Sequence, residues 1–324
     1  MVGAEADDVR LMALDPDPFN RWDAGQRIAT RALLNAVADG TEPADPLPAE
    51  FVAALEATIR EASLDTAFRA LCLALPAEET LADLIEACDP DRVHRVREAA
   101  RRQIGVGLAA DLDELYHTLT VNRPYRPDAR DAGDRALRNA ALALLAASSS
   151  GGIDLARRQF EGANNMTDRM AALRAVNDLE DDTRDALLAA FHARFRDDHL
   201  VVDKWLSLEA SSSRAGTLDR VRALLEHDAF SLDRPNKVRA LIGAFATANP
   251  VCFHDAGGAG YRFLAEQVAR IDGRNPQLAA RLVQPLCRWR RLEPGRRDLM
   301  RAELAGLAAG ASRDLAEIVA RSLG

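Results

Sequence analysis

Helix signals recur along the whole chain, and no segment sustains the alternation of apolar and polar residues that is typical of a strand. Asp17-Pro18 and Asp65 start helices, because Asp caps the first turn and Pro is accepted at the first helical position. Gly40 ends one of these helices. We therefore predict an all-α fold. The segments that we expect to be helical are 18–39, 48–61, 66–75, 77–88, 91–104, 108–121, 129–147, 153–162, 167–179, 182–195, 200–210, 218–227, 237–248 and a segment that begins at Pro276.

The architecture predicted from this pattern is a superhelical bundle of antiparallel helix pairs, an α-solenoid of the HEAT or armadillo kind. Hydrophobic residues make up 48% of the chain but aromatic residues only 5%, which favours close-packed helices over sheets. Short helices joined by short polar breaks bury their apolar faces against the next pair. Val221-Arg222-Ala223-Leu224 recurs as Val238-Arg239-Ala240-Leu241, but no fixed period follows. We expect a single domain over residues 1–324, with a weak sub-boundary at the Ser- and Gly-rich segment 148–152.

Charge and cysteine usage restrict the class of protein. The net charge of −8 argues against general nucleic-acid binding, and the chain has no run of 18 apolar residues, so we expect neither a nucleic acid nor a membrane as partner. The chain has four cysteines and no Cys-x-x-Cys pair, which indicates buried reduced thiols. We expect a cytoplasmic protein.

The stretch from Arg234 to Arg291 is the best candidate for a functional surface. Asn275 is a good helix cap, and we expect the helix that follows it to continue through Pro285 with a kink. Its apolar face would carry Leu278, Leu282, Leu286 and Trp289, and a polar face would carry Gln277, Arg281, Gln284 and Arg288. Residues 270–301 hold nine Arg against three acidic residues, which indicates either a solvated basic face or a surface that attracts carboxylates.

This stretch also carries a family resemblance, together with three shorter strings. Residues 234–291, Asn164-Asn165-Met166-Thr167-Asp168, 200–205 and 20–24 look like parts of the C-terminal helical domain of bacterial aminopeptidase N, a family of zinc-dependent aminopeptidases. The resemblance covers nearly the whole chain and implies an all-α superhelical bowl. The family's zinc motif, His-Glu-x-x-His, is absent, since none of the six His residues is followed by Glu. The chain therefore resembles the domain beside the active site, without the catalytic domain.

The resemblance also implies a role and three site residues. Arg239 and Arg281 match arginines that line the cavity in the family, and Gln277 lies one turn before Arg281. The domain would close the catalytic chamber, control the entry of peptides and contact the distal end of the substrate. Its partners would be the catalytic domain of the same enzyme and the peptide substrate. We expect no catalytic residue, metal ligand or cofactor in this chain, and Zn in the full-length enzyme.

Two other classes of function remain open at this point. The chain could be a free-standing α-solenoid scaffold that binds a protein partner in its groove. Asp181, Asp182 and Asp185 match the acidic string of magnesium-dependent prenyl-transferring enzymes, although carboxylates at a helix start are the simpler interpretation. The His192–His199 cluster lacks the four-residue spacing of helical zinc ligands, and the glycine-rich segment 257–260 is interpreted as a turn.

Overall fold

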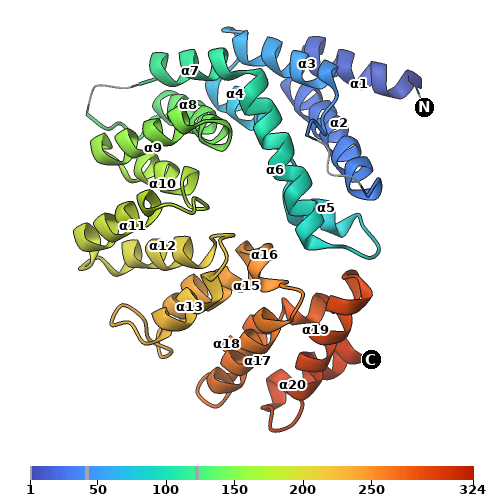
Figure 1. Cartoon of the computed structure of the whole chain (residues 1–324), viewed down its shortest axis with the longest axis vertical. Helices are drawn as coiled ribbons and strands as arrows, with labels where there is room; N and C mark the ends of the chain where they lie inside the picture. The colour runs from blue at the N-terminus through green and yellow to red at the C-terminus, as the bar shows by residue number, and fades with distance from the viewer. Residues whose placement is uncertain (1, 41–43, 121–123) are drawn as a thin grey trace. The chain divides into compact units, whose positions relative to one another are not determined.

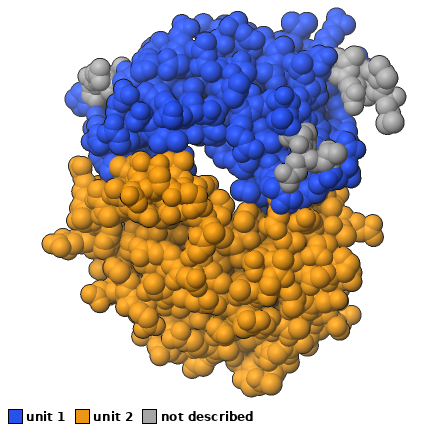
Figure 2. Space-filling view, in the orientation of Figure 1, with its two compact units in different colours: residues 1–81, 92–176 blue, residues 82–91, 177–324 orange. Residues whose placement is uncertain are grey.

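The structure is a computed structural model that describes residues 2–40, 44–120 and 124–324, and within these ranges it contains helices and no strand (Figure 1). The chain divides into two compact units (Figure 2), which we call unit 1, residues 1–81 and 92–176, and unit 2, residues 82–91 and 177–324. The all-α solenoid prediction is confirmed. The segment at residues 148–152 lies inside unit 1, where Ser149 caps a helix, and the division between the units falls elsewhere.

Unit 1 contains two groups of helices in contact. The first three helices, α1, α2 and α3, contact one another, and α8 contacts α4, α7, α9 and α10. The bounds are α1 (Val2–Leu14), α2 (Pro18–Ala38), α3 (Ala49–Arg60), α4 (Thr66–Cys72), α5 (Glu78–Asp83, whose last residues belong to unit 2), α6 (Pro90–Gly107, whose first residues belong to unit 2), α7 (Ala109–Thr118), α8 (Ala129–Ser148), α9 (Ser150–Gly162) and α10 (Met166–Ala175). Residue 121, the expected end of one helix, lies outside the described residues.

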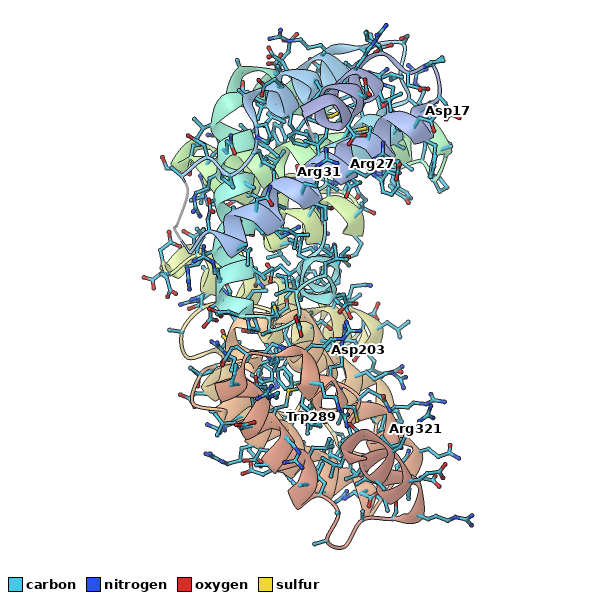
Figure 3. The ribbon with its side chains drawn as sticks, turned by 90° about the vertical axis from the view of Figure 1, so that its right-hand side faces the viewer. Asp17, Arg27, Arg31, Asp203, Trp289 and Arg321 are labelled. Atoms are coloured by element: carbon cyan, nitrogen blue, oxygen red, sulfur yellow. The ribbon has the colours of Figure 1, made fainter. Side chains whose placement is uncertain are left out.

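Helix starts in unit 1 follow the capping signals of the sequence. The Asp17 side chain accepts a hydrogen bond from the Phe19 N–H at the start of α2 (Figure 3), and Asp65 does the same for α4. Buried Arg21 then joins α2 to its neighbours, since its Nε–H donates to the Met12 carbonyl and its Nη1 pairs with Glu61 at 2.9 Å. Burying this guanidinium is tolerated because its donors are satisfied.

Unit 2 continues the helical pattern with shorter elements. Its core gathers the fully buried rings of Phe245, Phe253, Phe263 and Tyr261. The bounds are α11 (Asp182–Phe195), α12 (His199–Ala210), α13 (Thr217–Leu225), α14 (Pro235–Val238), the π-helix η1 (Arg239–Gly243), α15 (Ala244–Ala248), α16 (Pro250–Phe253), α17 (Ala259–Asp272), α18 (Pro276–Leu282), the 3₁₀ helix η2 (Leu286–Arg291), α19 (Pro294–Gly306) and α20 (Arg313–Leu323). The glycine-rich segment is a turn before α17, with Gly258 at φ +71°.

Residues 82–91 belong to unit 2 although their flanks belong to unit 1. The Cys88 N–H donates to the Arg291 carbonyl at 2.8 Å, and the Glu293 N–H donates to the Cys88 carbonyl at 3.0 Å. Buried Arg296 of α19 reaches Asp89, Asp91 and the His254 carbonyl. These contacts fix a segment from the first third of the chain against its last helices.

One helix of unit 2 differs from the expectation. Asn275 caps α18 as predicted, but the helix stops at Leu282 and a separate 3₁₀ helix begins at Leu286. Pro285 has no N–H to donate to the Arg281 carbonyl, and its ring crowds that carbonyl. The predicted kink is therefore a full break.

Candidate functional site

The residues proposed from the sequence, Gln277, Arg281 and Arg239, all lie on exposed positions of unit 2. Gln277 and Arg281 stand four residues apart on α18, so their side chains project from the same side of the helix. Neither side chain makes a hydrogen bond or ion pair with any residue that the structure describes. Both are therefore available to an external ligand.

Arg239 opens the π-helix η1, and this element comes close to α18 at Gly243. A Cβ placed on Gly243, four residues after Arg239, would lie 4.0 Å from Leu282 Cδ1. Leu282 is the residue after Arg281, so the two arginine-bearing elements approach each other at this point of unit 2. The Arg239 guanidinium bonds only the side chain of Asn236, one turn away, among the described residues. Single π-turns inside helices are frequent at functional sites.

The basic segment 270–301 separates into paired arginines and one unpaired arginine. Arg288 and Arg291 pair with Asp83, and Arg274 pairs with Asp233. Arg270 bonds Gln267, and Arg290 bonds the Ser322 carbonyl. Arg296 and Arg297 pair with acidic residues, and Arg301 lies over the ring of Trp289. Arg281 is the one member of the nine whose guanidinium contacts no described residue. Most arginines of the segment are therefore held by other residues, and Arg281 is the one whose guanidinium has no partner among the described residues.

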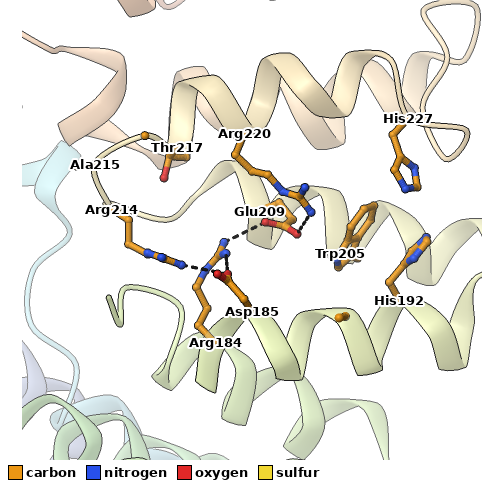
Figure 4. Close-up of a pocket in the computed structure, with 12 residues that line it drawn as sticks. Arg184, Asp185, His192, Trp205, Glu209, Arg214, Ala215, Thr217, Arg220 and His227 are labelled. Carbon is orange, nitrogen blue, oxygen red and sulfur yellow. Dashed lines mark hydrogen bonds and ion pairs between the residues drawn. The ribbon is translucent and has the colours of Figure 1, made fainter. Parts of the chain in front are cut away.

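A second feature of unit 2 is a pocket of about 540 Å³ between α11, α12 and α13 (Figure 4), which we call the α11–α13 pocket. Glu209 lies at its floor with only 3% of its side chain exposed, between Arg184 Nη2 at 3.1 Å and Arg220 Nη2 at 2.7 Å. Asp185 pairs with Arg184 at 2.7 Å and with Arg214 at 3.0 Å. Burial alone would raise the pKa of Asp185, but the hydrogen bond from Arg184 and the charge of Arg214 lower it.

Aromatic rings form the other end of the pocket. The His192 ring stacks on Trp205 with centroids 4.2 Å apart, and His227 stands edge-on to His192 at 5.3 Å. Burial lowers the pKa of His192, and the neighbouring His227 lowers it further. Among the described residues, the buried Trp205 Nε1–H has no acceptor.

Two residues of this pocket, Asp185 and His192, were considered from the sequence, but not as parts of a shared site. Asp185 belongs to the acidic string at the start of α11, but Asp181 caps that helix and Asp185 is held by arginines, which contradicts a magnesium site there. His192 was expected only as part of a surface helix end. Trp205 lies in the string 200–205 that carries part of the family resemblance, but the resemblance assigns it no role, and no motif marks Glu209.

The described residues contain one group of three possible metal ligands, and it does not fit the zinc site of an aminopeptidase. Glu78, His94 and Glu98 in unit 1 have ligand atoms within 4.8 Å of one another. Both oxygens of Glu98 are bonded by Arg101, at 2.9 and 2.8 Å, and the group holds one His. Catalytic zinc in this class takes two His and one Glu with an open position.

No helix among the described residues has the length and apolar character that a membrane crossing requires. The four cysteines are free; Cys88 is buried, and Cys72, Cys252 and Cys287 are half-buried.

Comparisons with known proteins agree with the sequence resemblance. The family model described as "Domain of unknown function (DUF3458_C) ARM repeats" matches residues 5–324. Aminopeptidase N of Caulobacter vibrioides is 39% identical over 318 residues, and that of Escherichia coli is 38% identical over 317 residues. Each alignment covers 97% of this chain but only 36% of the relative, so the chain spans about a third of the length of these enzymes.

A solved structure is also similar to this chain over about a third of its own length. The crystal structure of Legionella pneumophila aminopeptidase A in complex with aspartic acid superposes with a TM-score of 0.89 at 26% identity, covering 98% of this chain and 38% of that one. The expected resemblance to the C-terminal part of aminopeptidase N is thereby confirmed, and the chain belongs to the DUF3458_C family of ARM-repeat domains.

Proposed function

We propose that this chain is the helical C-terminal part of a zinc-dependent aminopeptidase, which removes N-terminal residues from peptides. The similarity over 97% of the chain to a part of three such enzymes supports this. The zinc ligands and the group that activates water would belong to the catalytic domain, since this chain has no His-Glu-x-x-His sequence. A cytoplasmic location is part of the proposal, because free thiols persist in reducing compartments.

In this proposal the domain closes the catalytic chamber, restricts entry to peptides that fit it, and contacts the distal end of the substrate. The observation that carries the last role is the unpaired guanidinium of Arg281. Arg offers a planar fork that matches a carboxylate, and Arg281 has no internal acid that would compete for it among the described residues. Gln277 supplies an amide on the same helix face, and Arg239 adds a second charge from the neighbouring η1. The ligand would be the C-terminal carboxylate of a short peptide.

The expected kinetic effect follows from the distance between this contact and the reacting bond. A charge-assisted hydrogen bond contributes about 1.5–3 kcal/mol, so its removal weakens binding by roughly 10- to 150-fold. A contact made equally in the ground state and the transition state appears in KM and leaves kcat unchanged.

The test uses the full-length enzyme with Arg281→Ala and Arg239→Ala. KM should rise for free tri- and tetrapeptides, and stay constant for amino-acid anilides and for peptides with an amidated C-terminus. Arg281→Lys should recover only part of the loss, because an ammonium cannot form the two-pronged bond. The matched control is Arg262→Ala, an exposed arginine of α17 that lies 3.6 Å from Glu303 and outside the proposed site. Equal losses on all substrates would assign both arginines a structural role and contradict the proposal.

A further inference from the structure

We propose that the α11–α13 pocket is a binding site for a small planar aromatic oxyanion, a molecule that joins a flat ring to a carboxylate or phosphate group. This site is separate in its residues from the Arg239, Arg281 and Gln277 surface, and the inference does not depend on the proposed function.

The charges that line the pocket do not balance. Three guanidinium groups face two carboxylates, since Arg184, Arg214 and Arg220 surround Asp185 and Glu209. Arg220 uses only Nη2 for Glu209, and its Nε and Nη1 contact no acceptor among the described residues. Arg214 pairs with Asp185 through Nη1, and its Nε lies 3.4 Å from the exposed Glu180. Its Nη2 has no acceptor in the part of the chain that the structure describes.

The N-terminus of α13 adds to this positive end. Ala215, Gly216 and Thr217 line the pocket, and Gly216 at φ +84° precedes the helix without any side chain that caps it. Unsatisfied N–H groups and the helix dipole favour an anion at such a position. Gly216 can hold this left-handed conformation because it has no Cβ. Arg220 lies three residues into the same helix, close to where the anion would be held.

The other end of the pocket suits a flat ring. Trp205 and His192 are stacked with an angle of 29° between their planes, and His227 stands at 77° to His192. The Ala229 N–H donates to His227 Nδ1 at 3.0 Å, so a neutral His227 carries its proton on Nε2 and can donate to a ligand. The Trp205 side chain lines the same end of the pocket and is only 3% exposed, and its indole N–H has no acceptor among the described residues.

Size and rigidity support a small molecule as the occupant. A pocket of about 540 Å³ falls within the range of sites that hold drug-sized ligands. Arg184 is fixed before any ligand arrives, because its Nε–H donates to the buried Asn177 carbonyl at 2.9 Å while its other nitrogens hold Asp185 and Glu209. A preorganised set of donors loses little conformational freedom on binding.

The experiment titrates the 324-residue chain with three probes, 2-naphthoate, acetate and 2-naphthamide. Binding is followed by calorimetry and by the indole N–H resonances of Trp22, Trp205 and Trp289, assigned with Trp205→Phe. We expect saturable one-to-one binding of 2-naphthoate that shifts the Trp205 resonance and leaves that of Trp22 unchanged. Acetate lacks the ring and 2-naphthamide lacks the charge, so each should bind at least about tenfold more weakly.

Matched variants locate the charge contact. Arg220→Gln should weaken 2-naphthoate at least about tenfold, whereas Arg222→Gln on the opposite side of α13, paired with Asp219, should change affinity less than about twofold. If loss of the Glu209 partner unfolds Arg220→Gln, Arg214→Gln gives the same readout without touching Glu209. Equal affinity for 2-naphthoate and 2-naphthamide, no shift of the Trp205 resonance, or the same affinity in Arg220→Gln and Arg222→Gln would overturn the proposal.

Discussion

Replacing Arg296 by Met should destabilise unit 2 strongly, because this buried arginine joins three parts of the unit. Its side chain is 7% exposed, its Nε–H donates to the His254 carbonyl, and its Nη groups reach Asp89, Asp91 and Glu293. Met preserves most of the aliphatic volume and removes all of these donors.

The magnitude follows from the burial of each partner. The His254 carbonyl loses its side-chain donor, and an unsatisfied buried acceptor costs about 1–3 kcal/mol. The carboxylates of Asp89, Asp91 and Glu293 are 41%, 33% and 30% exposed, so solvent screens each pair to at most about 1 kcal/mol. We expect a total loss of about 2–4 kcal/mol in the free energy of unfolding, which lowers the melting temperature of unit 2 by on the order of 10 °C.

The assay is urea unfolding followed by tryptophan fluorescence and circular dichroism. Trp205 and Trp289 report on unit 2, and Trp22 reports on unit 1, so single-Trp versions can assign the affected transition. Arg297→Met is the matched control, since Arg297 is the adjacent residue, is 41% exposed and pairs only with Asp298 among the described residues; its effect should stay within about 0.5 kcal/mol. A loss of this small size for Arg296→Met would refute the reasoning.

Three further predictions concern unit 2 and the isolated chain. Burial and the charges of Arg296 and Arg288 lower the pKa of His254 to about 3. Below about pH 6.5 the unfolded chain therefore binds a proton at His254 that the folded chain does not bind. The free energy of unfolding falls as the pH is lowered from about 6.5 towards about 3. His254→Gln should remove about 2 kcal/mol of the stability difference between about pH 7 and pH 5, measured by urea unfolding, and an unchanged difference would contradict this. Gly260→Ala should lower the free energy of unfolding by about 1–3 kcal/mol, because the added Cβ would lie 2.3 Å from the Phe253 carbonyl oxygen. The control Gly306→Ala, whose Cβ would have nothing within 4 Å, should be neutral or stabilising. Equal melting temperatures for the two variants would contradict this. The isolated chain should neither hydrolyse an amino-acid anilide nor retain stoichiometric zinc after dialysis, and turnover that a chelator abolishes would disprove this.

Local signals in the sequence predict much of the helical structure. Asp17, Asp65 and Asn275 cap helices as their residue type indicates, because a cap depends on a few neighbouring residues. The segment 237–248 was expected as one α-helix, but it contains the π-turn of η1, which no propensity reveals. The break at Pro285 was underestimated as a kink.

Local signals do not predict contacts between residues that are far apart in the sequence. The pairing of Cys88 with Leu292 depends on the path of the whole chain and leaves no trace in either local sequence. The candidate site shows the same limit. The resemblance supplied Arg281, but only the structure shows that its neighbours are paired while Arg281 itself has no partner among the described residues. The α11–α13 pocket was missed because three elements contribute one or more side chains each, and each element alone looks ordinary.

The placement of residues 82–91 has a consequence for the order in which the protein folds. During synthesis this segment leaves the ribosome early, but its partners Arg288, Arg291 and Arg296 come about 205 residues later. Until they appear, Asp83, Asp89 and Asp91 have no counter-charges from α19 and η2, and unit 2 cannot be completed. Because closing so long a loop is slow, we expect the early helices of unit 1 to form first and the docking of residues 82–91 to be a late step in folding. A chain truncated before η2 would therefore leave this segment exposed to proteases, although all of its own residues are present.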